Sequence, residues 1–370
     1  MVKRSSIIML SILLVFTIIL TGCTTPQVSP AASTSQQIAN TPASAASTET
    51  STAPTKKFTV GFSNYSLGNS WRVQMQYELQ AAADKYIADG VMDQLIITNA
   101  NDDIAKQIAD VKDLITKKVD AILISAASAD ALAPVCEEAI DKGIKVVCFD
   151  NIVNSDKLTC TVQVDQKDFG TIGGQWLVDK LGGKGNIVVL NGIAGTSVNN
   201  DRYAGAKAVF DKNTGIKILA EANADWDYAK GKAAVEGFLA AYPQIDGVWT
   251  QGGAMTLAAL DAFKEAKRPL VPMAGEAYNG LLKEWKAEHA NGFDTICPCM
   301  PTYLSSSALD IAIQSLQGQT VDKVVTVKLP VVDWDHIDQY LKPDLPDSFW
   351  PITKMNDAQI AKMYQENPIK

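Results

Sequence analysis

The sequence predicts an α/β fold of two doubly wound lobes, each built on a parallel sheet, that are joined by a three-segment hinge. From residue 58 onward, short β-branched runs alternate with helical patterns, as expected for parallel sheets covered by helices. The alternation restarts after Asp165, so two runs of similar size follow each other. About 310 residues remain once the unusual N-terminal segment is set aside, and that length suits two cores better than one.

The first run supplies the strands and helices of the first lobe. Strand-like stretches occupy 58–62, 95–98, 121–124, 145–149 and 160–164. Helical patterns, with apolar residues three and four positions apart, lie between them over about 71–88, 104–115 and 128–140. Ser128 stands where it would cap the third of these helices. Successive strands joined through helices are expected to run parallel.

The second run repeats the pattern after Asp165. It begins with a helix over about 169–181, which leads through a glycine-rich turn into a strand over 186–190. The later helices are expected at 201–212, 227–241, 255–266 and 279–289. The later strands are expected at 217–220, 246–249, 270–274 and 293–297.

The remaining elements define the hinge. A helix after Thr302 and a strand over 324–329 are too few to bury a core, so they must join an existing sheet. The first lobe is therefore expected to comprise 57–164 and 299–331, and the second 165–298 and 332–370. The three hinge segments fall near 165–166, 297–300 and 331–333. The tail beyond Trp334 receives no role.

The N-terminus has the parts of a secretory signal over residues 1–22: a basic start, a short apolar run and small residues before Cys23. The ending Leu20-Thr21-Gly22-Cys23 resembles the lipobox of bacterial lipoproteins, which implies acylation of Cys23 and anchoring of the chain outside the cytoplasm, on the cell membrane or on an outer membrane. The alternatives are an ordinary secretory signal or a membrane anchor with an incidental cysteine. Residues 23–56 are dominated by Thr, Ser, Ala, Pro and Gln, which predicts a disordered linker.

Composition excludes several function classes. The net charge of −8, without a run of Lys or Arg, argues against nucleic acid as a partner. Neither histidine lies beside a nucleophile, and no cysteine pattern fits a metal, so no cofactor or metal is expected.

After Cys23, five cysteines remain. A disulfide between Cys148 and Cys160, on successive strands, is one possibility; buried inert thiols are the other.

The loops that follow the strands carry polar and aromatic residues. In doubly wound folds, ligands bind outside the carboxyl ends of the strands, so two facing lobes place both sets of loops around one cleft. The candidate ligand-binding residues there are Asn69, Trp71, Arg72, Ser125, Asp150, Asn151, Asp165, Arg202, Trp226 and Glu276. Carboxylates, amides and arginine bind hydroxyl groups, and a flat indole covers the C–H face of a sugar ring.

An ordered set of segments resembles the ribose-type periplasmic binding proteins, the solute receptors of sugar ABC transporters with the type I periplasmic-binding fold. The set comprises Asn99-Ala100-Asn101-Asp102, Val119 to Ile124, Gly143 to Val147, and Gly192 to Ser197 with Asp201-Arg202. The resemblance runs in order from about residue 58 to 333. It implies a receptor that closes on a monosaccharide or polyol and delivers it to a membrane permease, as a monomer.

The resemblance assigns family positions to residues of this chain. The first-loop contacts fall on Asn69, Trp71 and Arg72, where a second aromatic is usual in place of Arg72. The acidic contact falls on Asp150, followed by Asn151 instead of the common Arg. The remaining positions, in the second lobe, fall on Arg202, Trp226 and Glu276, the last replacing the usual Asp. Two amide positions are lost, at Gln251-Gly252-Gly253 and at Cys297-Pro298-Cys299, which is expected to open space and to disfavour ribose itself.

Some of these residues have a structural alternative. Asp165 is placed to cap a helix, and Ser125 has a short reach. Trp350, with three other tryptophans, shows no placement in the cleft. An enzyme is not expected: no nucleophile elbow is present, although paired carboxylates in a cleft can cut glycosides. A sensor that presents a bound sugar or quorum signal to a chemoreceptor or kinase is the competing function, because it would use the same cleft.

Overall fold

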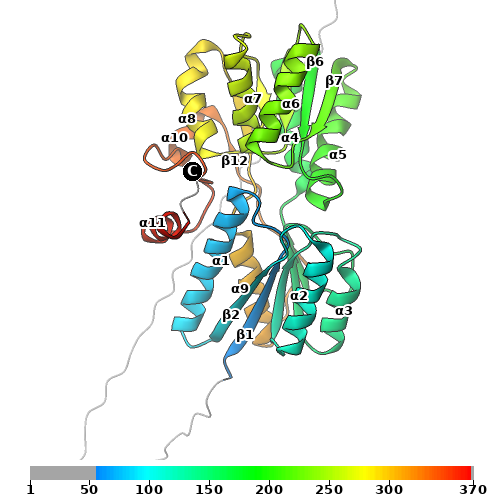
Figure 1. Ribbon diagram of the computed structural model, residues 1–370, viewed down its shortest axis with the longest axis vertical. Helices are drawn as coiled ribbons and strands as arrows, with labels where there is room; N and C mark the ends of the chain where they lie inside the picture. Colours follow the sequence, from blue (N-terminus) through cyan, green and yellow to red (C-terminus); the bar gives the residue numbers. More distant parts are fainter. Residues whose placement is uncertain (1–55, 368–370) are drawn as a thin grey trace, which may run out of the picture. The chain divides into compact units, whose positions relative to one another are not determined.

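The computed structural model describes residues 56–367 of the chain, and these residues form two α/β lobes (Figure 1). The predicted signal segment, Cys23 and the predicted linker up to residue 55 lie outside the described residues. Each lobe is built around one six-stranded sheet with helices on both faces. The predicted fold class, two doubly wound lobes, is confirmed.

The first sheet is parallel throughout, in the order β11-β5-β4-β3-β1-β2. Its strands are β1 (Phe58–Asn64), β2 (Met92–Asn99), β3 (Ala121–Ser125), β4 (Lys145–Phe149), β5 (Cys160–Gln163) and β11 (Val324–Thr326). Its helices are α1 (Ser70–Ala88), α2 (Ile104–Thr116), α3 (Ala133–Asp141) and α9 (Leu304–Leu316). Helices α1 and α9 cover one face, and α2 and α3 cover the other (Figure 1).

The second sheet has the order β12-β10-β9-β8-β6-β7, and only its edge strand β12 runs antiparallel to its neighbour. Its strands are β6 (Lys184–Asn191), β7 (Gly215–Asn223), β8 (Gly247–Thr250), β9 (Met273–Ala274), β10 (Thr295–Pro298) and β12 (Val331–Val332). Its helices are α4 (Gln166–Lys180), α5 (Ser197–Lys212), α6 (Tyr228–Ala241), α7 (Gly253–Glu265) and α8 (Asn279–Glu288), the last followed by η1 (His289–Asn291).

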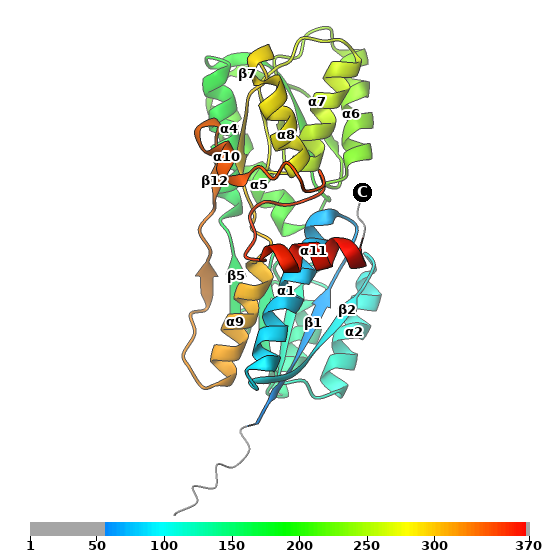
Figure 2. The same ribbon diagram turned by 90° about the vertical axis from the view of Figure 1, so that its left-hand side faces the viewer.

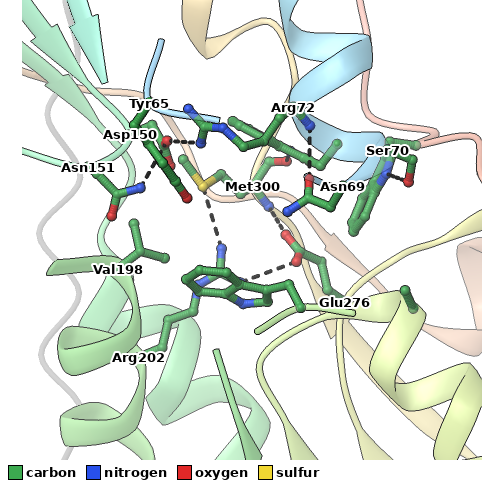
Figure 3. A pocket seen from close by; sticks show the side chains of 14 residues that line it. Tyr65, Asn69, Ser70, Arg72, Asp150, Asn151, Val198, Arg202, Glu276 and Met300 are labelled. Carbon is green, nitrogen blue, oxygen red and sulfur yellow. Dashed lines mark hydrogen bonds and ion pairs between the residues drawn. The ribbon is translucent and has the colours of Figure 1, made fainter. Parts of the chain in front are cut away.

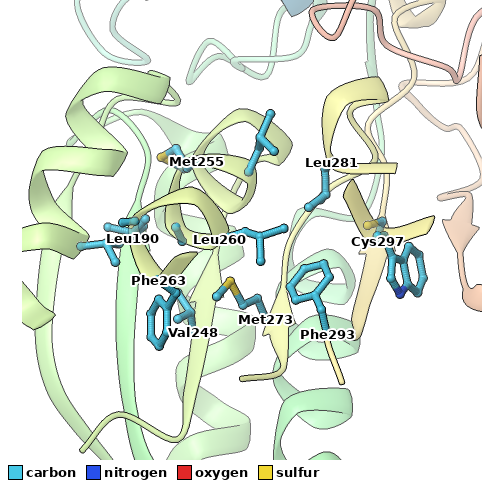
Figure 4. Packing of buried hydrophobic residues seen from close by; sticks show 14 of the residues in the cluster. Leu190, Val248, Met255, Leu260, Phe263, Met273, Leu281, Phe293 and Cys297 are labelled. Atoms are coloured by element: carbon cyan, nitrogen blue, oxygen red, sulfur yellow. The ribbon is translucent and has the colours of Figure 1, made fainter. Parts of the chain in front are cut away.

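Alternation along each strand divides the side chains of the second lobe between two cores. Val188 and Leu190 face the core under α6, α7 and α8, whereas Ile187 and Val189 face the core under α4 and α5. Figure 4 shows Leu190, Val248 and Met273 packed against α7 and α8 in the first of these cores. Continuous apolar strands are expected in a sheet that is buried on both faces.

The chain passes between the two sheets three times, from β5 to α4, from β10 to α9 and from β11 to β12. These passages lie at or beside the three segments expected for the hinge. Beyond β12 the tail forms η2 (Trp334–His336), α10 (Ile337–Tyr340) and α11 (Asp357–Glu366). The tail was expected to stay with the second lobe, but α11 lies against α1 of the first lobe (Figure 2).

One sequence expectation was wrong for a local reason, and the two alternatives for Cys148 and Cys160 are decided in favour of buried thiols. Helix α3 begins at Ala133, with Pro134 in its first turn and Leu132 as N-cap, and the Ser128 hydroxyl accepts a hydrogen bond from the Ala131 amide instead of capping that helix. Cys148 and Cys160 are both free and buried. They lie on neighbouring strands, but Cys148 faces the core under α2 and α3 while Cys160 faces the opposite core, so no disulfide forms.

Candidate functional site

A cavity lies where the strand-end loops of both lobes meet (Figure 3). It is lined by Tyr65, Asn69, Ser70, Trp71, Arg72, Asp150, Asn151, Val198, Arg202, Trp226, Ala254, Glu276, Met300 and Trp350. All of the candidate residues except Ser125 and Asp165 are therefore brought together at one cavity.

The first-lobe wall is organised around Arg72. Helix α1 begins at Ser70 because the Asn69 side chain caps it, accepting a hydrogen bond from the Arg72 amide at 3.0 Å. This places the Arg72 guanidinium in the first turn, where it is 3 % exposed. It donates to Asp150 Oδ2 at 2.6 Å, and its other donors reach Asn64, Ser125 and the Ser66 carbonyl.

Protein atoms thus use most of the hydrogen-bonding capacity of Arg72. Its guanidinium also stacks 3.8 Å from the Tyr65 ring. Burial works to lower the pKa of Arg72, but Tyr65 and the Asp150 carboxylate outweigh burial and raise it. Burial raises the pKa of Tyr65 to about 12, so Tyr65 presents a neutral phenol to the cavity.

The second-lobe wall is organised around Arg202 on α5. Its Nη1 donates to Glu276 Oε2 at 3.2 Å and to the Gln251 carbonyl at 2.6 Å, while its Nε donates to Gln166. Nη2 has only the Met300 sulfur at 3.5 Å among the described residues, and a thioether is a weak acceptor. Figure 3 shows Arg202 pointing toward Met300 and Glu276. Among the described residues, Arg202 therefore keeps both N–H groups of Nη2 for a ligand, whereas Arg72 keeps one N–H of Nη1.

Glu276 and Met300 join the second-lobe wall to the hinge. Glu276 Oε1 accepts a hydrogen bond from the Met300 amide at 2.8 Å, and the Met300 carbonyl accepts one from the Trp71 indole at 2.9 Å. Met300 lies in the passage from β10 to α9, so this chain of bonds runs from one lobe to the other. Burial raises the pKa of Glu276, although Arg202 opposes the shift.

Three tryptophans form apolar walls of the cavity. The indole N–H of Trp71 donates to Met300, that of Trp226 donates to the Gln251 carbonyl at 3.2 Å, and that of Trp350 donates to Ser70 Oγ at 2.9 Å. Each indole N–H already has a protein partner. The three rings consequently offer carbon surface to a ligand and no further hydrogen bond.

Trp226 fills space that the sequence led us to expect to be open. A Cβ atom on Gly192 would lie 2.2 Å from the Trp226 ring, and one on Gly252 would lie 2.8 Å from it. A Cβ on Gly253 would meet Tyr278 and the Glu276 carbonyl. The expectation that Gly252 and Gly253 enlarge the cavity is therefore wrong, because their missing side chains make room for protein atoms. Trp226 itself has a left-handed backbone with φ of 56°, a strained conformation typical of functional sites.

Asn151 supplies an unused acceptor. Its Nδ2 donates to Asp150 Oδ2 at 3.1 Å, whereas its buried Oδ1 has no hydrogen-bond partner. A buried amide oxygen without a partner is costly unless a water molecule or a ligand satisfies it. Because Asn151 lines the cavity, its Oδ1 is a candidate acceptor for a ligand hydroxyl.

Ser125 and Asp165 lie outside the cavity lining and have structural partners. The Ser125 hydroxyl donates to Asp150 Oδ2 at 2.6 Å and accepts from Arg72 at 3.0 Å, so it supports the first-lobe ion pair from behind. The Asp165 carboxylate caps α4 by accepting from the Asp168 amide at 2.9 Å. Asp165 instead borders a separate hollow beside the hinge.

Sequence reasoning missed several lining residues. They are Tyr65, Ser70, Val198, Ala254, Met300 and Trp350. Tyr65 and Ser70 belong to the same strand-end loop as Asn69, and a search of the whole loop would have found them. Trp350 was given no place in the cleft, and no strand or helix pattern around it in the sequence indicates one.

Helix packing positions Arg202. A Cβ atom on Gly170 of α4 would lie 1.9 Å from the Arg202 carbonyl oxygen, so only glycine permits the close approach of α4 and α5. We predict that Gly170→Ala displaces α5, weakens ligand binding and lowers the free energy of unfolding by about 1–3 kcal/mol. Urea unfolding and calorimetric titration measure the two effects. Gly237→Ala on α6, where a Cβ meets nothing within 4 Å, is the matched control and should leave both unchanged or slightly improved. Equal behaviour of the two variants would contradict the prediction.

The raised pKa of Glu276 predicts how the free energy of unfolding changes with pH. Because the folded pKa lies above the ordinary value of 4.5, the stability that Glu276 contributes is fully present below about pH 4.5 and is lost as pH rises through the raised folded pKa. Glu276→Gln removes this titration. The free energy of unfolding of the wild type, minus that of the variant, should therefore increase as pH falls from 7.5 to 5 in urea titrations. A constant or decreasing difference would show that the carboxylate is not desolvated as described.

Two features are absent from the part of the chain that the structure describes. No helix within residues 56–367 has the length and apolar character needed to cross a membrane. Within the same range, no cluster of three or more His, Cys, Asp or Glu side chains could hold a metal ion.

The sequence of this chain is similar to those of known binding proteins. The family described as periplasmic binding protein domain matches residues 60–320. The xylitol-binding protein of Mycolicibacterium smegmatis is 32% identical over 246 residues, which are 66% of this chain and 70% of that protein. The ribose import binding protein RbsB of Bacillus subtilis is 27% identical over 274 residues, 74% of this chain and 87% of that protein.

A solved structure extends the similarity into three dimensions. The ABC transporter solute binding protein from Thermobispora bispora superposes with a TM-score of 0.74 at 27% identity, covering 85% of this chain and 97% of that one. These relatives are binding proteins rather than enzymes, in agreement with the expectation of a non-enzymatic protein.

Proposed function

Because the chain belongs to the ribose-type periplasmic binding protein family, we propose that it captures an uncharged monosaccharide or polyol in the cavity between its lobes and delivers it to the permease of an ABC importer. The observation that carries the proposal is the charge balance of the cavity. Both of its arginines are paired with carboxylates of their own lobe, Arg72 with Asp150 and Arg202 with Glu276.

A balanced cavity disfavours a charged ligand. A sugar phosphate or sugar acid would bring a charge into a buried site where each arginine already has its partner, and an unpaired buried charge is costly. An uncharged polyhydroxyl compound avoids this cost. Its hydroxyls would bind Arg202 Nη2 and Asn151 Oδ1, which the protein leaves unused, and its C–H groups would lie against the indole rings.

The named ligands of the relatives, xylitol and ribose, belong to this chemical class. The departures from the family pattern, at Arg72, Asn151 and the two lost amides, favour a ligand other than ribose. A pentitol such as xylitol is the first candidate, because one of the relatives binds it.

Isothermal titration calorimetry of the purified protein tests the proposal. Xylitol, D-ribose, D-fructose and myo-inositol would be compared with the charged analogues ribose 5-phosphate and gluconate. We expect saturable binding of at least one neutral compound and binding at least tenfold weaker for the charged analogues, a difference of about 1.4 kcal/mol. Saturable binding of the charged compounds alone, or of none of the neutral compounds, would rule out this ligand class.

We further propose that the receptor works outside the cytoplasm as a monomer, closing by rotation of the lobes about the three passages between the sheets. Closure would bury the ligand, and the closed form would be recognised by the permease.

Uptake of the labelled ligand by cells distinguishes import from sensing. Deletion of this protein should abolish uptake, whereas a sensor would leave basal uptake intact.

Cys23 provides a separate prediction about the anchor. The Leu20 to Cys23 pattern predicts cleavage before Cys23 and acylation of its thiol. In cells labelled with a palmitate analogue, the wild-type protein should carry the label and sediment with membranes. Cys23→Ser should lose both properties, while Cys136→Ser, at a buried thiol of the folded part, should keep them. Label retained by Cys23→Ser would exclude this cysteine as the acylated residue.

A further inference from the structure

The C-terminal tail connects the two lobes a fourth time. Helix α10 packs on the core of the second lobe, and α11 lies beside α1 of the first lobe (Figure 2). Between them, residues 341–356 pass along one edge of the cavity and place Trp350 in its lining. No function was predicted for this segment from the sequence.

Asn279 anchors the tail to the second lobe. This residue is fully buried at the start of α8, and its Nδ2 donates to the carbonyls of Lys342, Leu345 and Pro346 at 2.8–3.1 Å. The Asn279 amide also donates to the Phe349 carbonyl at 3.0 Å. These hydrogen bonds hold the backbone from Lys342 to Phe349, immediately before Trp350.

Gln74 and Glu78 of α1 anchor the tail to the first lobe. Gln74 binds the backbone of Trp350 twice, accepting from its amide at 3.0 Å and donating to its carbonyl at 2.7 Å. Glu78 is 3 % exposed and accepts hydrogen bonds from Thr302, Thr353 and the Lys354 amide. The backbone on both sides of Trp350 is therefore fixed by buried polar side chains.

The ring of Trp350 is held as firmly as its backbone. Its N–H donates to Ser70 Oγ, and its ring packs edge-on against Tyr278 of the second lobe with centroids 5.3 Å apart. The side chain is 7 % exposed and lines the cavity. With backbone, N–H and ring edge all in contact, the indole cannot rotate away without breaking several of these contacts.

On the premise of the proposed function, we infer that Trp350 is a specificity-determining residue that limits the length of the ligand at this end of the cavity. A fixed indole excludes any ligand that reaches past it. Truncation of the side chain would extend the cavity into the space that the indole now fills between Ser70 and Tyr278. A ligand of two sugar units would then gain space, while a single unit would lose an apolar wall.

The test compares ligand selectivity, which a purely structural role would not change. Calorimetry with xylitol, D-ribose and the disaccharide maltose would be performed on the wild type, Trp350→Ala and Trp350→Phe. Ile360→Ala is the control, because it loosens the docking of α11 without lining the cavity. The selectivity of each variant is the Kd for maltose divided by the Kd for xylitol or D-ribose, whichever binds more tightly. We expect Trp350→Ala to lower this ratio by about tenfold or more. Trp350→Phe should shift the ratio less in the same direction, and Ile360→Ala should leave it unchanged although its Tm falls.

The results of this test distinguish failure of the inference about Trp350 from failure of the proposed function. If the wild type binds xylitol or ribose and Trp350→Ala keeps the wild-type ratio, the inference about Trp350 is overturned and the proposed function stands. If Trp350→Ala does not fold, an unchanged ratio in Trp350→Phe overturns it. If the wild type binds no neutral compound, the proposed function fails and the inference fails with it.

Discussion

Arg202→Ala should abolish ligand binding and lower the free energy of unfolding by about 3–5 kcal/mol. The substitution leaves the Glu276 carboxylate buried without its counter-ion, and it removes the Nη2 donor that the protein itself uses only weakly. Calorimetric titration with the ligand of the wild type and urea unfolding measure the two losses. The same α5 helix offers a control in Lys207→Ala, whose exposed side chain pairs with Asp211, and this variant should bind and unfold like the wild type.

A double variant separates stability from binding at Arg202. Arg202→Met with Glu276→Gln removes both buried charges but keeps an oxygen that can accept from the Met300 amide. We expect the double variant to regain part of the lost stability, because no unpaired charge remains, and to stay unable to bind. If Arg202→Ala kept the wild-type affinity, Arg202 would not belong to the ligand site.

Arg72→Met should destabilise the protein by a similar amount, about 3–5 kcal/mol, because it leaves Asp150 buried without a cation. Asn64 and Ser125 lose their Arg72 partner at the same time. Arg72 has four of its five N–H donors bound to protein oxygens, against three for Arg202, so Arg72→Lys should bind ligand measurably while losing stability. Urea unfolding measures the loss of stability in these variants, and calorimetry measures their affinity for the ligand. A loss of affinity in Arg72→Lys without any loss of stability would make Arg72 a direct ligand contact.

The alternation of strand and helix made most of the fold predictable. It placed Asp150, Asn151 and Arg202 after their strands, and the carboxyl ends of parallel strands meet at one edge of a sheet. The cavity lining includes these residues for that reason. Trp71 and Trp226 were found in the same way, from their loops on opposite lobes.

The remaining features depend on contacts that a sequence does not reveal. Whether Cys148 faces Cys160 depends on the register of β4 and β5, in which Val147 is the partner of Cys160. The function of Gly252 depends on the Trp226 ring, 26 residues earlier in the sequence, which occupies the space beside it. Trp350 reaches the cavity through its hydrogen bonds to Gln74 and Ser70, nearly the whole folded chain away. In each case the partner is distant and no periodic pattern marks it.

A crystal structure of the protein with the tightest-binding neutral compound of the titration panel is the decisive test of the proposed ligand site. We expect the compound in the cavity between the lobes, with hydroxyls on Arg202 Nη2 and Asn151 Oδ1 and its C–H groups against the indoles of Trp226 and Trp350. Arg72–Asp150 and Arg202–Glu276 should remain paired around it. A compound bound elsewhere, or bound with either ion pair broken to receive it, would rule out this site.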